Sequence, residues 1–295
     1  MRICSTSENK QFEKRISITP EVAKKYINLG FEVSLIENYG LHLGYGNNQY
    51  KELGVNIVKD EKELINNSDI LVQLGLLSDD KISIVREKQT VIGIFDPYKN
   101  KDKIKNLSKK NINIFSLELL PRITRAQSMD VLSSQANLAG YKAVIESFSN
   151  FERAIPMMMT AAGTIPAAKV LVVGAGVAGL QAIATAKRMG AVVFATDVRI
   201  TSKEQVESLG GKFLSIETTE DLETKEGYAQ ETSEEFKLKQ QKLLSDRFKK
   251  FDIIICTALI PGKKAPKIIN EQMIKDIQEG SIVCELGVEQ GGNTA

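Results

Sequence analysis

The chain has 295 residues, which is long enough for two domains of ordinary size, each with its own hydrophobic core. Hydrophobic residues make up 42% of the sequence and charged residues 26%, a composition typical of a soluble globular protein. The 39 Lys and Arg residues against 37 Asp and Glu leave a formal charge of +2 that is dispersed along the chain, which argues against a nucleic-acid-binding protein with a clustered basic surface.

Cysteine, histidine and hydropathy patterns exclude several further classes of protein. Cys4, Cys256 and Cys284 are far apart in apolar runs, so we expect neither a metal site nor a disulfide framework. One histidine, His42, leaves no material for a multi-histidine site. No apolar stretch approaches the roughly 18 residues of a membrane span, and the first ten residues lack the apolar region of a signal peptide. We therefore expect no transmembrane segment.

Short apolar runs alternate with helical patterns, such as 20–30 and 101–111, in the N-terminal half of the chain. Buried strands separated by helices are typical of a parallel sheet that is covered on both faces. We predict a Rossmann-like N-terminal domain over residues 1–135, with strands at 2–7, 32–37, 55–59, 69–74, 90–95 and 112–118.

A long helix is predicted over about 129–150, where apolar residues recur on one side. The segment that follows, 151–167, is rich in Pro, Gly and small residues and has the composition of a domain junction. Its three adjacent methionines, Met157 to Met159, are more typical of gap-filling core than of a binding surface.

The alternation then restarts and predicts a second domain over 136–295, with strands at 168–174, 191–197, 211–216, 251–258 and 281–287. A polar stretch at 217–248 is too long for a tight connection; its second half favours a helix and its first half a loop centred on Gly227 and Tyr228. The fold class is therefore α/β, with two doubly wound parallel-sheet domains and a cleft between them.

The segment 168–199 carries the strongest local motif. Gly174, Gly176 and Gly179 form G-x-G-x-x-G between a buried strand and a helix, and Asp197 ends the next strand. The glycines permit a tight turn, backbone approach to a pyrophosphate and close helix–strand packing, while the helix N-terminus favours phosphate. The Asp197 carboxylate can accept ribose hydroxyls and repels a 2′-phosphate, which favours NAD(H) over NADP(H), although nearby Arg199 softens that repulsion. Glycines for packing alone and Asp197 as a helix cap are the structural alternative.

Several segments resemble the NAD(H)-binding domain of the proton-translocating nicotinamide nucleotide transhydrogenases and, more distantly, alanine dehydrogenase. The resemblance runs from ENKQFEKRISITPEVAKKY to VEQGGN and is dense in PRITRAQSMD, VGAGVAGLQAIATAKRMGAVV, KEQVESLGGKF, GYAQE and TALIPGKKAP. It implies that Arg122, Gln127 and Asp130 position the nicotinamide without acting as acid or base. Considered without the resemblance, these three residues also suit a charged turn capped by Ser128 or Asp130.

The resemblance implies further contacts with the bound nucleotide. They are Val177, Val198, Arg199, Gly227, Gln240 and Leu259, and Tyr228 belongs to a loop that closes over the nucleotide. The implied activity is Re/Si-specific hydride transfer from NADH on this chain to NADP+ on a partner domain, coupled to proton translocation by a separate membrane domain. The resemblance also implies a homodimer at the cytoplasmic face of a bacterial inner membrane, or on the matrix side in mitochondria, and no metal.

Two other functions remain open at this point. An alanine dehydrogenase requires a lysine and a histidine in the first domain, but Gln73 stands at the apparent lysine position and GIFDPYKN (93–100) contains no histidine. Glu289 replaces the dehydrogenase's aspartate, whereas Arg15 is common to both families. A non-catalytic NAD-sensing module is the third possibility. The related domain continues beyond VEQGGN, so we expect the second domain to be truncated at Ala295.

Overall fold

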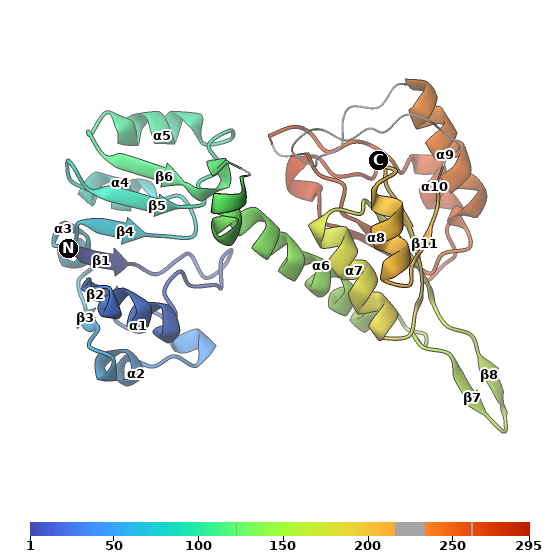
Figure 1. Cartoon of the computed structure of the whole chain (residues 1–295), viewed down its shortest axis with the longest axis horizontal. Coiled ribbons are helices and arrows are strands. Elements are labelled where there is room, and N and C mark those ends of the chain that lie inside the picture. Colours follow the sequence, from blue (N-terminus) through green and yellow to red (C-terminus); the bar gives the residue numbers. More distant parts are fainter. Residues whose placement is uncertain (122, 216–233, 261) are drawn as a thin grey trace. The chain divides into compact units, whose positions relative to one another are not determined.

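The computed structural model describes residues 1–121, 123–215, 234–260 and 262–295 (Figure 1). By the contacts between its residues, the chain divides into two compact units, Met1–Val131 and Leu132–Ala295. The division falls where helix α6 (Val131–Asn150) begins, close to the boundary predicted at 135/136. Each unit contains a parallel sheet, so the predicted α/β class with two doubly wound domains is confirmed.

The N-terminal unit is built on a six-stranded sheet in the order β3-β2-β1-β4-β5-β6, in which every pairing is parallel. All six strands fall within runs that the sequence predicts, because each is a short apolar segment between helical patterns. Their bounds are Arg2–Ser5 (β1), Glu32–Ile36 (β2), Asn56–Val58 (β3), Ile70–Val72 (β4), Thr90–Gly93 (β5) and Asn113–Ser116 (β6).

Helices cover both faces of this sheet. Residue Ile3 of β1 packs on one face with residues of α1 and α2, and Cys4 packs on the other with residues of α3, α4 and α5. The sequence starts α1 locally, since Thr19 Oγ1 accepts a hydrogen bond from Val22 N and Pro20 occupies the first turn. The helices are Pro20–Asn28 (α1), Asn47–Glu52 (α2), Glu61–Asn66 (α3), Asp79–Ile84 (α4) and Lys101–Ser108 (α5), with 3-10 turns at Leu41–Leu43, Leu117–Leu119 and Thr124–Met129.

The C-terminal unit has a five-stranded parallel sheet in the order β11-β10-β9-β12-β13. Val170 and Val172 of β9 pack with α6, α7 and α8, whereas Leu171 and Val173 pack with α9 and α10. The bounds are Lys169–Val173 (β9), Val177–Arg188 (α7), Val192–Thr196 (β10), Ser202–Ser208 (α8), Lys212–Phe213 (β11), Glu234–Phe248 (α9), Ile253–Cys256 (β12), Glu271–Asp276 (α10), Ile282–Glu285 (β13) and Val288–Gln290 (η4).

The segment expected to be a domain junction forms an antiparallel hairpin instead, with strands β7 (Met158–Thr160) and β8 (Gly163–Ile165). In Figure 1 this hairpin extends from the rest of its unit. The prediction that its methionines fill core was wrong, because Met157 and Met159 are 61% and 72% exposed. A two-stranded hairpin with neither face covered has no core to which these side chains could contribute.

The structure describes only part of the polar stretch at 217–248. The helical second half of the polar stretch is present as α9, while its first half, including Gly227 and Tyr228, lies outside the described residues. Within the described ranges, no helix is both long and apolar enough to cross a membrane.

Candidate nucleotide-binding site

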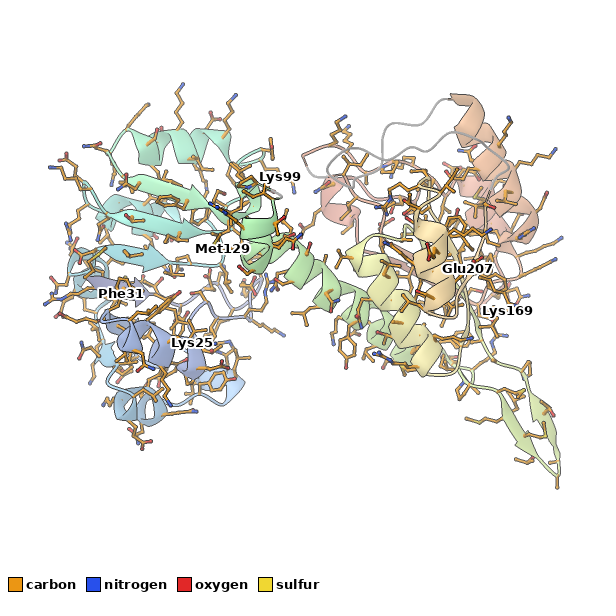
Figure 2. The ribbon with its side chains drawn as sticks, in the orientation of Figure 1. Lys25, Phe31, Lys99, Met129, Lys169 and Glu207 are labelled. Carbon is orange, nitrogen blue, oxygen red and sulfur yellow. The ribbon has the colours of Figure 1, made fainter. Side chains whose placement is uncertain are left out.

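The glycine-rich turn follows β9 directly, at the carboxyl end of the strand where the strand order of the C-terminal sheet reverses. Lys169, labelled in Figure 2, is at the opposite end of β9. Strands β10 and β12 flank β9, so the turns after all three strands meet at this edge. In open α/β sheets this switch point is where ligands bind.

The three glycines of the motif have different surroundings. Gly174 has φ +96°, and an added Cβ would lie 2.9 Å from Thr257 Oγ1, so both its conformation and its contact with the β12 turn require glycine. A Cβ at Gly179 would overlap the carbonyl oxygen of Gly174, so this glycine lets α7 approach the turn. A Cβ at Gly176 would meet no atom within 4 Å. Of the three, Gly176 therefore leaves open space beside the backbone.

Helix α7 begins at this open space. Its N-cap is Gly176, and no side chain caps the helix with a hydrogen bond. The first-turn N–H groups from Val177 onward therefore remain available, together with the positive end of the helix dipole. Val177 itself is 39% exposed. An uncapped helix N-terminus beside an unfilled glycine fits a phosphate group.

Asp197 follows β10 and turns its carboxylate toward the glycine loop. Its Oδ2 accepts a hydrogen bond from Ala175 N at 2.7 Å, and its Oδ1 accepts one from Arg199 N at 2.9 Å. The Arg199 guanidinium binds both oxygens, with Nε–Oδ1 and Nη2–Oδ2 distances of 2.9 Å. Val198, between them, is partly buried.

The turn after β12 completes the edge. Thr257 Oγ1 donates to the carbonyl oxygen of Gly174 at 2.9 Å, and Leu259 is 39% exposed. The buried Asn293 side chain ties this turn to the end of the chain: its Oδ1 accepts from Ala258 N at 3.1 Å and its Nδ2 donates to Ala258 O at 2.8 Å.

Glu285, at the end of β13, holds the segment that carries Asn293. Its Oε1 accepts from Gly287 N at 2.7 Å and its Oε2 from Asn293 N at 2.6 Å. Thr257, Glu285 and Asn293 were not predicted from the sequence. The GGN sequence at 291–293 was a signal of a tight turn, but nothing in it indicated which strand end the asparagine would reach.

The other expected contacts are distributed over the chain. Gln240 is buried on α9 at 6% exposure. Gly227 and Tyr228 lie outside the described residues, as does Arg122. Gln127 is exposed in the 3-10 turn that ends at Met129, and Asp130 N donates to Gln127 O at 3.2 Å. The exposed Met129, labelled in Figure 2, is separated from the start of α6 by Asp130 alone.

Gln73 follows β4 in the N-terminal unit, at the position where the resemblance to alanine dehydrogenase predicts a lysine. It is 3% exposed, and its Oε1 accepts hydrogen bonds from Ser5 Oγ and Thr6 N, both at 3.0 Å. Tyr39 Oη extends the same network through Ser5 Oγ at 2.8 Å. This neutral amide cannot take up or release a proton as a lysine would.

Two of the three cysteines are buried, and the one histidine makes a hydrogen bond on the surface. Burial raises the pKa of the Cys4 thiol to about 12 and raises the pKa of Cys256 further, so both thiols stay protonated at neutral pH. The ring of His42 hydrogen-bonds through Nε2 to Lys14 O at 2.7 Å on the surface of the N-terminal unit.

Family models match nearly the whole chain. The N-terminal domain of alanine dehydrogenase/PNT matches residues 6–139, and the C-terminal domain of alanine dehydrogenase/PNT matches residues 143–295. The chain belongs to the alanine dehydrogenase/PNT family. Members of this family bind a nicotinamide nucleotide, which fits the open glycine turn, the uncapped α7 and the carboxylate at the end of β10.

Within this family, the sequence is more similar to transhydrogenases than to alanine dehydrogenases. It is 46% identical to the first part of the NAD(P) transhydrogenase alpha subunit of Rickettsia prowazekii over 99% of this chain and 78% of that protein, with the same figures for the Rhodospirillum rubrum protein. The crystal structure of transhydrogenase from Sinorhizobium meliloti matches with a TM-score of 0.88 and 42% identity, covering 100% of this chain and 80% of that chain.

Alanine dehydrogenase is a more distant relative. Alanine dehydrogenase 1 of Staphylococcus aureus is 22% identical over 99% of this chain and 74% of that protein. A solved L-alanine dehydrogenase, 18% identical, matches with a TM-score of 0.81 over 100% of this chain and 76% of that chain, which shows a shared fold. The chain is thus a transhydrogenase alpha-subunit homologue, as its sequence segments predicted.

Proposed function

We propose that this chain is the NAD(H)-binding subunit of a proton-translocating transhydrogenase. The observation that carries the proposal is the carboxyl edge of the C-terminal sheet, where Gly176, the first turn of α7 and Asp197 surround one switch point. The pyrophosphate would bind the free N–H groups beside Gly176, and Asp197 would receive the adenosine ribose. A 2′-phosphate would add a second negative charge beside that carboxylate, so we expect NADH to bind more tightly than NADPH.

The remaining cofactor contacts are proposed from the family segments. They are Gly174, Val177, Gly179, Val198, Gly227, Tyr228, Gln240 and Leu259, with Arg199 beside Asp197 at the adenosine ribose. The exposure of Val177 and Leu259 supports this, because an apolar side chain beside a nucleotide site can pack against the bound ring systems.

We propose that Arg122, Gln127 and Asp130 hold the nicotinamide end. The carboxamide has both a donor and an acceptor, and an amide and a carboxylate with an arginine can satisfy both. The exposed side chain of Gln127 is accessible to a ligand. Holding the ring matters because reacting atoms must approach to about 3–3.5 Å in a fixed orientation.

In the proposed reaction, the C4–H bond of NADH breaks and its electron pair moves with the hydrogen to C4 of NADP+. The products are NAD+ and NADPH, and no proton is gained or lost. The step therefore needs apposition of two rings and no acid–base group, which agrees with the neutral, hydrogen-bonded Gln73. Reduction of a keto acid with ammonia would require such a group.

The relatives' name describes one portion of an alpha subunit, which supports the proposal that NADP(H) binds on a separate partner domain and that a membrane-spanning domain moves the proton. The chain would then act as a peripheral component of a complex, on the cytoplasmic face of a bacterial inner membrane or the matrix side in mitochondria, with Re/Si stereospecificity. We also propose a homodimer, supported by the exposed apolar side chains of the β7–β8 hairpin.

An assay of alanine oxidation by the purified chain distinguishes the proposed transhydrogenase function from that of an alanine dehydrogenase. With alanine and NAD+ we expect no NADH formation above background, and none of the reverse reaction from NADH with pyruvate and ammonia, because Gln73 cannot serve as the lysine. A Gln73→Lys variant is the matched comparison and should also stay inactive, since no histidine is supplied. Robust alanine-dependent absorbance at 340 nm from the parent chain would identify a dehydrogenase and overturn the proposal.

A further inference from the structure

Asp197 has no acceptor position left for a ribose hydroxyl. A carboxylate offers about four lone-pair positions. In the structure four N–H groups occupy them: Ala175 N and the backbone N, Nε and Nη2 of Arg199, at 2.7 to 2.9 Å. A dinucleotide that bonds Asp197 must therefore displace one or more of these donors.

The two backbone donors and the guanidinium differ in how readily they can leave. Ala175 N sits in the turn fixed by Gly174, and Arg199 N is two residues from Asp197 in the same tight turn. The guanidinium is carried by a long side chain with several rotatable bonds. It is also the group that releases two acceptor positions at once, one on each oxygen, which matches the two hydroxyls of a ribose.

The ion pair between Arg199 and Asp197 is shielded from solvent, so breaking it should have a measurable effect on binding. The side chains of Arg199 and Asp197 are 14% and 7% exposed, and the contact is bidentate. Bidentate pairs between arginine and a carboxylate are among the strongest side-chain interactions, and solvent screens them less when they are partly buried. Displacement of Arg199 is therefore a cost that NADH binding has to overcome.

We propose that Arg199 competes with the adenosine ribose for Asp197 and so narrows the preference of this site for NADH over NADPH. The inference rests on the proposed NAD(H) site and deepens it. NADH binds by displacing the guanidinium from the carboxylate. With NADPH, the guanidinium pairs with the 2′-phosphate and offsets the repulsion from Asp197, because arginine recognises phosphate with the same two-pronged geometry.

Fluorescence titration of NADH and NADPH against Arg199→Gln tests this. Glutamine removes the positive charge and the bidentate geometry of the guanidinium. We expect NADH affinity to rise about fivefold, which is the size expected for the loss of one competing ion pair. We expect NADPH affinity to fall by a similar factor. Arg199→Lys keeps the positive charge but not the bidentate geometry, so it should raise NADH affinity and retain most of the NADPH affinity. Arg188→Gln, at the exposed end of α7, is the control and should change neither affinity.

A second measurement follows the guanidinium directly. In the free protein, the bond to Oδ1 protects the Arg199 Nε proton from exchange with water; saturation with NADH should remove that protection, as seen in the arginine Nε–H signal by NMR. The inference is overturned if Arg199→Gln weakens NADH binding, leaves NADPH affinity unchanged, or if the protection persists in the NADH complex. Failure of the parent chain to bind NADH would instead refute the proposed function. Thermal unfolding of each variant confirms folding first.

Discussion

Gly176 and Gly179 stand three residues apart in one motif, yet the structure gives them different constraints. Gly179 is in contact with the Gly174 carbonyl, so it is needed by the fold itself. Gly176 has ordinary dihedral angles, φ −76° and ψ −168°, and open space where a side chain would be. No contact within the described residues requires glycine there, which supports the proposal that a ligand occupies this space.

Alanine substitutions at these two positions should therefore separate stability from binding. Gly176→Ala should leave the free energy of unfolding within about 0.5 kcal/mol of the parent, but reduce NADH affinity about tenfold or more, because the methyl group occupies the space for the pyrophosphate. Gly179→Ala should cost about 1–3 kcal/mol of stability through overpacking. Chemical denaturation and NADH titration measure the two effects. Equal NADH affinity for Gly176→Ala and the parent would show that the turn does not approach a ligand.

At the residue scale, the sequence predicts those site residues that are close to one another in the chain. The glycine turn and Asp197 are recognisable because a strand, a tight turn and a helix impose their order on neighbouring residues. The bidentate ion pair of Arg199 with Asp197 depends on the side-chain rotamer of Arg199, which the sequence spacing of the two residues does not determine. Thr257 contacts the glycine turn, and Asn293 contacts the turn after β12. The sheet brings these residues together, and their distance in the sequence does not reveal it.

At the scale of elements, the C-terminal segment supports the turn after β12. Asn293 is fully buried and makes hydrogen bonds to both backbone groups of Ala258 and to Pro266 O at 3.0 Å. Its backbone is held in turn by Glu285. The position of Leu259, a proposed nucleotide contact, thus depends on residues at the end of β13 and beyond it.

Asn293→Ala should loosen this support. The substitution leaves partly buried backbone groups of Ala258 and Pro266 without the Asn293 side chain as partner, which we expect to lower the free energy of unfolding by about 2–4 kcal/mol. NADH affinity should fall as well, through the displaced turn. The exposed Asn106→Ala on α5 is the control and should stay within about 0.5 kcal/mol of the parent. Differential scanning calorimetry that finds Asn293→Ala as stable as the control would contradict this account of the segment.

Strand prediction succeeded because buried parallel strands are short apolar runs, readable without knowledge of their neighbours. All six strands of the first sheet fall within the predicted runs. The β7–β8 hairpin could not be predicted in this way: its methionines look like core residues, and only the structure shows that they are exposed. Local composition identifies apolar side chains that favour burial, but it does not show whether the rest of the fold covers them.

At the scale of the whole molecule, the same fold serves two chemistries in the family. The solved L-alanine dehydrogenase and the Sinorhizobium meliloti transhydrogenase both match this chain over its full length. Fold therefore does not separate the two activities, and individual residues must. Gln73, whose side chain accepts hydrogen bonds from Ser5 and Thr6, is a neutral amide at the position where the resemblance to alanine dehydrogenase predicts a lysine. A neutral amide at this position suits the proposed hydride transfer between two nucleotides, because that step needs no acid–base group.

Isotope tracing shows whether the hydrogen passes directly from NADH to NADP+. The chain is mixed with its NADP(H)-binding partner, NADH carrying deuterium at both C4 positions, and NADP+ in ordinary water, and the NADPH formed in a single turnover is examined by mass spectrometry. We predict that every NADPH carries one deuterium from NADH, because the C4 hydrogen passes between the rings without exchange with solvent. NADPH formed with hydrogen from water, or no NADPH from a mixture in which both proteins bind their nucleotides, would contradict the account.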